Sequence, residues 1–252
     1  MGASNLLKGF AQSMSMYSAI PVPGLKWDSR ADRHMLAMYP LVGAVIGGLW
    51  MGAARLLEGL ELPALPCGAL LTVLPLLLTG FLHLDGFMDV CDAVLSRRDK
   101  ARRLEILKDS HTGAFAVISL GILLMLQFSA VHTLFLERER LLFLLIPILS
   151  RGWSGLGLLR LPLLEGSSMG AWARKDTGPW HGVFLGLCAA AAALALGIWG
   201  GLPGIAAAAA GTAGYWLAVW FAVGQLGGVS GDVSGYALCI SEAASLMAAA
   251  LV

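Results

Sequence analysis

The chain has 252 residues, of which 58% are hydrophobic and 13% are charged, and its mean hydropathy is +0.76. A soluble globular domain is about half apolar and about 25% charged, so this composition excludes an ordinary soluble domain. The formal net charge of +1, without a long basic stripe, gives no indication of nucleic-acid binding.

The hydropathy pattern predicts an all-α, polytopic membrane bundle. Residues 4–20 predict a short interfacial helix that Pro21 and Pro23 terminate. Apolar stretches of roughly 20 residues, the length that a bilayer requires, then predict seven transmembrane helices, the last of them the shortest. We expect one membrane domain over residues 1–252, with further short helices outside the bilayer. The predicted spans are 35–57, 65–84, 113–136, 141–161, 181–200, 202–225 and 235–252.

The loop charges predict the orientation of these spans. The segment before the first span carries Lys26, Arg30 and Arg33, and basic loops stay on the cytoplasmic side. The loops predicted on the other side have fewer bases, which glutamates partly balance. If residues 26–33 are cytoplasmic, the other bases on that side are Arg97, Arg98, Lys100, Arg102, Arg103, Lys108, Arg174 and Lys175. The acidic segment described next therefore also faces the cytoplasm.

Residues 80–115 hold most of the carboxylates of this apolar chain. If residues 84–95 are helical, Asp85, Asp89 and Asp92 stand at i, i+4 and i+7 on one narrow face. Like charges at that spacing repel, and their neighbours are apolar, so the stripe predicts a bound cation. Carboxylate oxygens favour magnesium. The alternatives are a solvated helix face at the membrane edge, or aspartates that pair with Arg97, Arg98, Arg102 and Arg103.

Other polar residues flank the acidic stripe. His83 precedes it and could bind a ligand, relay a proton or bond to a neighbouring helix end. Glu105 and Asp109 have i, i+4 spacing beside Arg102, Arg103 and Lys108. This mixture is suited to a second metal or a phosphate clamp. The alternative is an ordinary amphipathic helix with paired charges.

The segment 226–235 is a glycine-rich loop at the start of the last span, and it contains Ser230, Gly231 and Asp232. Exposed amides at a helix N-terminus favour an anion. The alternative is a tight interhelical turn with Asp232 or Ser234 as the cap. Glu242, within the last span, is costly unless it faces a polar interior.

Several segments together resemble the cobalamin synthase family, the adenosylcobinamide-GDP ribazoletransferases. They occur in family order and cover the chain from near its N-terminus to its C-terminus. The matching segments are IPVP at 20–23, YPLVGAVIG at 39–47, LHLDGFMDVCDA at 82–93, RRLEILKDSHTGAF at 102–115, and GGVSGDVSG at 227–235.

The resemblance implies a magnesium-dependent transferase of a bacterial inner membrane. Its members join adenosylcobinamide-GDP to α-ribazole or its 5'-phosphate, release GMP and complete the nucleotide loop of the B12 coenzyme. A homo-oligomer, or a complex with other enzymes of that pathway, is compatible with this role. On the matching positions, the metal ligands are Asp85, Asp89 and Asp92, with Asp109 as the proton acceptor. The substrate-binding set is His83, Arg102, Arg103, Glu105, Lys108, Ser230, Gly231 and Asp232.

Two other classes of membrane protein share some of these features. Membrane CDP-alcohol phosphotransferases use aspartates with the same metal logic, but their pattern places an arginine where Val94 follows Ala93. Secondary transporters carry carboxylates near the midplane between repeated halves, whereas here the carboxylates lie near one edge and no internal repeat is evident. Both are therefore weaker interpretations.

Overall fold

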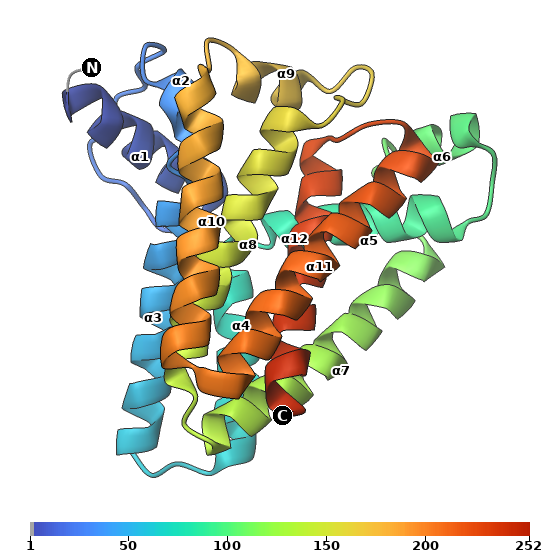
Figure 1. Cartoon of the computed structure of the whole chain (residues 1–252). Helices are drawn as coiled ribbons and strands as arrows, with labels where there is room; N and C mark the ends of the chain where they lie inside the picture. The colour runs from blue at the N-terminus through green and yellow to red at the C-terminus, as the bar shows by residue number, and fades with distance from the viewer. Residues whose placement is uncertain (1–2) are drawn as a thin grey trace.

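The computed structural model describes residues 3–252, which fold into twelve α-helices (Figure 1). No strand forms within this range, and Leu163 and Val229 make an isolated bridge. Six helices are long and apolar enough to cross a membrane. They are α3 (Tyr39–Gly59), α7 (Ala114–Leu136), α8 (Arg140–Arg160), α10 (Pro179–Trp199), α11 (Gly201–Leu226) and α12 (Gly231–Ala250).

The remaining predicted span, 65–84, covers α4 (Ala64–Leu78) and only the start of α5 (Leu82–Leu95), and the axes of these two helices differ by 91°. The break falls at Gly80 and Phe81, which have left-handed φ values of 60° and 63°. The pair counts as a seventh span if it is taken as one crossing, so the predicted helical membrane bundle is confirmed. The prediction that the last span is the shortest is confirmed among the six single-helix spans, because α12 has 20 residues and the other five have 21 to 26.

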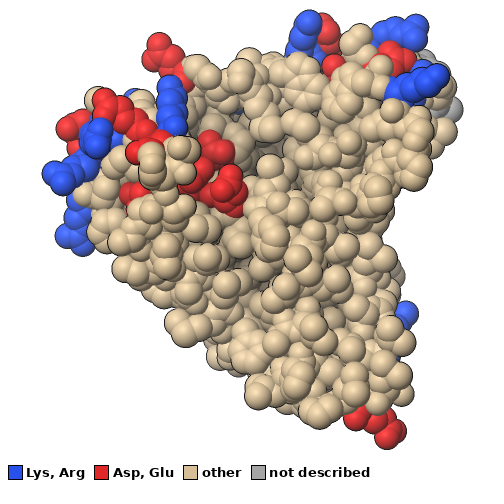
Figure 2. Space-filling model, turned by 180° about the vertical axis from the view of Figure 1, so that it is seen from behind, with Lys and Arg blue, Asp and Glu red and all other residues tan. Residues whose placement is uncertain are grey.

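Four short helices lie at one end of the molecule (Figure 1). They are α1 (Ala3–Tyr17), α2 (Asp32–Met35), α6 (Lys100–Ile106) and α9 (Ser168–Arg174). In Figure 2 most charged side chains gather at this end, which we call the polar end, above a broad surface with few charged residues. The predicted grouping of the polar segments on one side of the spans is therefore confirmed.

The surface below the polar end is formed by exposed hydrophobic side chains on the outward faces of the long helices. Leu187 and Leu194 on α10, Met125 on α7 and Trp220 on α11 are 63–76% exposed. Such a continuous apolar surface is unfavourable in water and matches the hydrocarbon core of a bilayer.

Helix α8 is the most buried of the six long helices, and it carries a charge in the interior. The Arg151 side chain is 2% exposed and its guanidinium donates to the Glu242 carboxylate at 2.6 Å. The Ser150 hydroxyl donates to the same carboxylate at 2.8 Å. The expectation that Glu242 requires polar surroundings within the last span is confirmed.

Candidate active site

The acidic stripe lies on α5, as its periodicity predicts. Asp85 is exposed, whereas Asp89 and Asp92 are half-buried. The opposite face of α5 buries Phe87 and Cys91. Because the chain turns sharply between α4 and α5, the acidic helix lies across the bundle near the polar end (Figure 1). Figure 2 shows acidic side chains around a hollow at this end.

A fourth aspartate joins the stripe from α12. Gly86 lies against the α12 backbone, where a Cβ atom at residue 86 would meet the Asp232 Cα atom at 2.7 Å. A glycine permits this approach because it has no side chain. The contact brings Asp232 to the acidic face of α5, and Asp89 experiences repulsion from Asp85, Asp92 and Asp232.

None of these four carboxylates makes an ion pair within residues 3–252. Of the two alternatives, the pairing of the aspartates with the neighbouring arginines is therefore absent from the described residues. No three histidine, cysteine or acidic side chains of the described residues converge closely enough to enclose an ion by themselves. Magnesium commonly takes one or two carboxylates and completes its shell with water and substrate phosphates. The oxygen donors present fit a site of that open kind.

The Asp92 side chain lies against the loop before α7. Its two carboxylate oxygens pack against Gly113, where a Cβ atom would overlap them. The loop between α6 and α7 therefore borders the acidic stripe. The motif glycine at residue 113 thus has a steric reason.

The glycine-rich loop leads into α12 beside the stripe. The Ser230 hydroxyl accepts a hydrogen bond from the Val233 amide at 3.2 Å and donates one to Asp232 at 3.3 Å. Ser230 is thus the helix cap, in place of the expected Asp232 or Ser234. The loop is fixed to the segment after α8 because the Leu164 amide donates to the Val229 carbonyl at 2.9 Å.

A small cavity of about 100 Å³ adjoins the acidic cluster. Its lining comes from the N-terminal region, α3, α5, α8, α9 and α12, so six separate segments meet there. The lining residues that carry polar side-chain groups are Tyr17, Tyr39, His83, Asp85, Ser154, Asp232 and Ser234. Six of these were absent from the metal ligands and the proton acceptor expected from the sequence, and four from all the expected site residues.

His83 lines this cavity together with Asp85. It is buried, and its Nε2 atom lies 2.5 Å from the Tyr39 hydroxyl. Arg151 lies 6.0 Å from the centre of the Tyr39 ring. The buried Arg151–Glu242 pair therefore supports the cavity from within the bundle. A buried arginine inside a predicted span was the available signal in the sequence.

The bases of α6 lie at the edge of this region rather than inside the cavity. Arg103 donates to the Gln225 side chain at the end of α11, and Arg102 pairs with Glu105 at 2.6 Å on the exposed surface. The Lys100 amine packs against Gly227 in the glycine-rich loop. Lys108 is exposed. These contacts place basic groups beside the loop that opens α12.

Asp109 lies outside α6, which ends at Ile106, so the expectation that Glu105 and Asp109 share a helical face was wrong. The Asp109 carboxylate accepts hydrogen bonds from the His111 ring at 2.7 Å and from the His111 amide at 3.0 Å. These bonds lower the pKa of Asp109. It does not line the cavity, and a lowered pKa makes a carboxylate a weaker base.

Comparison with known proteins agrees with the family resemblance of the motifs. The family profile described as cobalamin-5-phosphate synthase matches residues 9–250. Adenosylcobinamide-GDP ribazoletransferase of Clostridium botulinum strain Eklund 17B is 40% identical over 249 residues, which cover 98% of each chain. The protein of that name from Clostridium perfringens strain SM101 is 39% identical and covers 93% of this chain and 94% of its own.

A more distant relative of the same name, from Desulfitobacterium hafniense strain Y51, is 38% identical over 84% of both chains. No solved structure shows significant similarity. The resemblance found in the motifs is confirmed over nearly the whole length, and the chain therefore belongs to the cobalamin-5-phosphate synthase family, the adenosylcobinamide-GDP ribazoletransferases.

Proposed function

We propose that this protein joins adenosylcobinamide-GDP to α-ribazole or α-ribazole 5'-phosphate at the polar end of the bundle. The observation that carries the proposal is the cluster of four unpaired carboxylates from α5 and α12 beside one cavity. A diphosphate substrate arrives with its counter-cation, and such a cluster attracts that cation. The names of the relatives that match along the whole chain support the same substrates.

The reaction exchanges one bond to phosphorus for another. A ribose hydroxyl oxygen of the ribazole forms a bond to the phosphorus attached to cobinamide, and the bond from this phosphorus to the bridging oxygen breaks. GMP leaves with that oxygen, and the hydroxyl proton passes to a base. Asp232 lines the cavity and is therefore better placed than Asp109 to accept this proton. Asp109 does not line the cavity, and its role as the proton acceptor stays a prediction.

The cation that fits these oxygen donors is Mg²⁺, which Asp85, Asp89 and Asp92 would hold, with Asp232 beside them. When bound, it supplies positive charge to the diphosphate oxygens. The carboxylates and the diphosphate are both anionic acceptors, so hydrogen-bond donors from other residues must orient the diphosphate. The α12 N-terminus at Ser230 and Gly231 contributes amide donors for phosphate oxygens, and Arg102, Arg103 and Lys108 add positive charge at the edge.

We assign the polar end to the cytoplasmic side of a bacterial inner membrane. The basic side chains of the N-terminal loop, α6 and α9 lie at this end, whereas the opposite end combines arginines with glutamates, including the Arg140–Glu58 pair. By the positive-inside rule, this distribution of charge supports the assignment. Substrates and GMP are water-soluble or amphiphilic and meet the site from that side.

The test is a reconstituted assay with the whole protein in liposomes. Adenosylcobinamide-GDP, α-ribazole 5'-phosphate and Mg²⁺ are added, and mass spectrometry follows GMP and the cobalamin product. We expect equal amounts of both products. Turnover of a CDP-alcohol in place of these substrates, or solute flux without either product, would contradict the proposal.

A further inference from the structure

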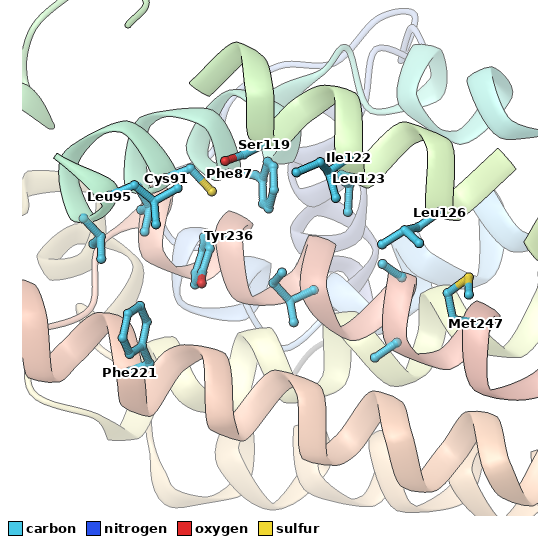
Figure 3. A pocket seen from close by; sticks show the side chains of 15 residues that line it. Phe87, Cys91, Leu95, Ser119, Ile122, Leu123, Leu126, Phe221, Tyr236 and Met247 are labelled. Atoms are coloured by element: carbon cyan, nitrogen blue, oxygen red, sulfur yellow. The ribbon is translucent and has the colours of Figure 1, made fainter. Parts of the chain in front are cut away.

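A second cavity lies on the reverse side of α5, away from the acidic stripe. It has a volume of about 380 Å³ and is bounded by α5, α7, α11 and α12. Figure 3 shows Phe87 and Leu95 from α5, Leu126 from α7 and Phe221 from α11 around this space. Ser119, Cys91 and Tyr236 bring its few polar groups, so it suits an apolar occupant.

This cavity faces the apolar outer surface of the bundle. Helix α12 packs against both α7 and α11, but these two helices do not pack closely against each other. The side chains beside the gap are exposed and apolar, with Ile122 and Leu126 on α7 and Phe221 on α11 exposed by 42–51%. In a bilayer these residues meet hydrocarbon, so the cavity is a groove open to lipid.

A polar depression adjoins the groove at the polar end. It lies among Ser96, Arg98, Asp99, Arg102, Ile106 and Phe115. Consecutive residues at the end of α5 line the two spaces, Leu95 the groove and Ser96 the depression. On α7, Phe115 and Ser119 are one helical turn apart and line the depression and the groove, respectively.

The depression has one base that no acid of the described residues neutralises. Asp99 is occupied as the cap of α6, where it accepts from the Arg102 amide at 3.0 Å. The Arg102 guanidinium pairs with Glu105. Arg98 makes no ion pair within residues 3–252. A phosphodiester is the anion that a lipid would bring to this position, since its phosphate lies directly above its acyl chains.

We propose that one anionic phospholipid occupies this site, with an acyl chain in the groove and its phosphate at Arg98. The lipid would complete the apolar packing of α5, whose opposite face carries Asp85, Asp89 and Asp92. It is therefore a structural ligand that backs the acidic helix. This proposal concerns binding only and does not depend on the reaction proposed above.

The first experiment uses the wild-type protein in liposomes that contain a photoreactive phosphatidylglycerol with its label on the acyl chain. Peptide mass spectrometry then locates the cross-links. We expect them on α5, α7 and α12, at residues that line the groove. The proposal would be overturned if the labels were spread evenly over the outer faces of α10 and α11. It would also be overturned if a second copy of the chain occupied the groove and cross-linked there in place of the lipid.

The second experiment blocks the groove and compares lipid retention by native mass spectrometry. Ser119→Trp places an indole in the groove, and Val117→Trp is the matched control because Val117 points outward from the same helix and is 57% exposed. We expect Ser119→Trp to lower the apparent affinity for phosphatidylglycerol roughly tenfold, the effect of displacing about two methylene groups. An equal loss of phosphatidylglycerol affinity in both variants would refute the groove as the binding site of the acyl chain.

The headgroup is tested separately with Arg98→Gln, and Arg138→Gln at the opposite end is its control. Wild-type protein should retain phosphatidylglycerol in preference to phosphatidylcholine, and Arg98→Gln should remove that preference. Wild-type protein that retains both lipids equally would overturn the assignment of an anionic lipid. Size-exclusion chromatography of each variant verifies that it is folded and monodisperse.

Discussion

Gly86 on α5 lies against the backbone of Asp232 on α12, so closely that a Cβ atom at residue 86 would come within 2.7 Å of the Asp232 Cα atom. This contact joins two segments that are far apart in the sequence. It sets the spacing between the α5 carboxylates and the glycine-rich loop. The acidic cluster therefore depends on a residue that carries no functional group.

Enlarging residue 86 should separate the two halves of the site. Gly86→Val is expected to lower the rate of GMP release by about 100-fold, because displacements of about 1 Å in a catalytic constellation have effects of that size. Gly48→Val is the matched control, since nothing lies within 4 Å of a Cβ atom there. Wild-type turnover by a folded Gly86→Val protein would contradict the role of this contact.

Asp89→Asn removes the charge at the centre of the acidic stripe without changing its shape. We expect loss of turnover and a decrease of about 10–100-fold in metal affinity, as for other changes around metal ligands. The affinity is measured without substrate turnover by electron paramagnetic resonance, with Mn²⁺ as the probe. Normal Mg²⁺-dependent turnover in this variant would rule out the metal assignment.

Asp109→Asn tests the other carboxylate that the sequence singled out. Because Asp109 is exposed and bonded to His111 outside the cavity, we expect this variant to keep both Mn²⁺ binding and most of its turnover. A loss as large as that of Asp89→Asn would restore Asp109 as the proton acceptor. The same assay with Asp232→Asn completes the comparison.

The buried Arg151–Glu242 pair should be sensitive to the loss of one partner. Glu242→Leu leaves the Arg151 guanidinium buried and unpaired, which typically costs about 3–5 kcal/mol. The double variant Arg151→Met, Glu242→Leu should recover most of this stability because it leaves no isolated charge. Thermal unfolding in detergent measures the effect, and Arg55→Met, an exposed residue, is the control. A double variant no more stable than the single one would disprove the interpretation.

The loop before α2 should lose its anchor at low pH. Asp28 accepts hydrogen bonds from Arg30 at 3.1 Å and from Lys8 on α1 at 2.8 Å, and these bonds lower its pKa. A carboxyl with a lowered pKa stabilises the folded state above its ordinary pKa, about 3.9, and loses this contribution as the pH falls further. The protection of the α1 amides against hydrogen exchange, relative to the intrinsic exchange rate at each pH, should therefore decrease below about pH 4.

Asp28→Asn provides the check on that result. The variant should show faster exchange of α1 already at neutral pH and little further change on acidification. An unaltered pH dependence in Asp28→Asn would assign the effect to another acid. Asp176→Asn, in the loop between α9 and α10, is the control.

The sequence alone determined the class of fold and the identity of most polar parts. Hydrophobic length predicted the membrane spans because a bilayer requires apolar helices of a fixed length. Helical periodicity placed Asp85, Asp89 and Asp92 on one face because neighbouring residues on a helix recur at fixed spacing. Both are local properties, and motif order along the chain was sufficient to indicate the family.

The tertiary structure decided which of these residues meet. The residues around Phe81 did not predict its left-handed backbone, at which α5 turns by 91° from α4. Packing between helices stabilises a bend of this kind, and local sequence does not encode that packing. Asp232 reaches the stripe only through the Gly86 contact, and Tyr39 and Arg151 join His83 from other helices. Asp109 left the predicted helical face because α6 ends at Ile106. Contacts between distant segments depend on how helices pack, and a single sequence specifies that packing only through the whole fold.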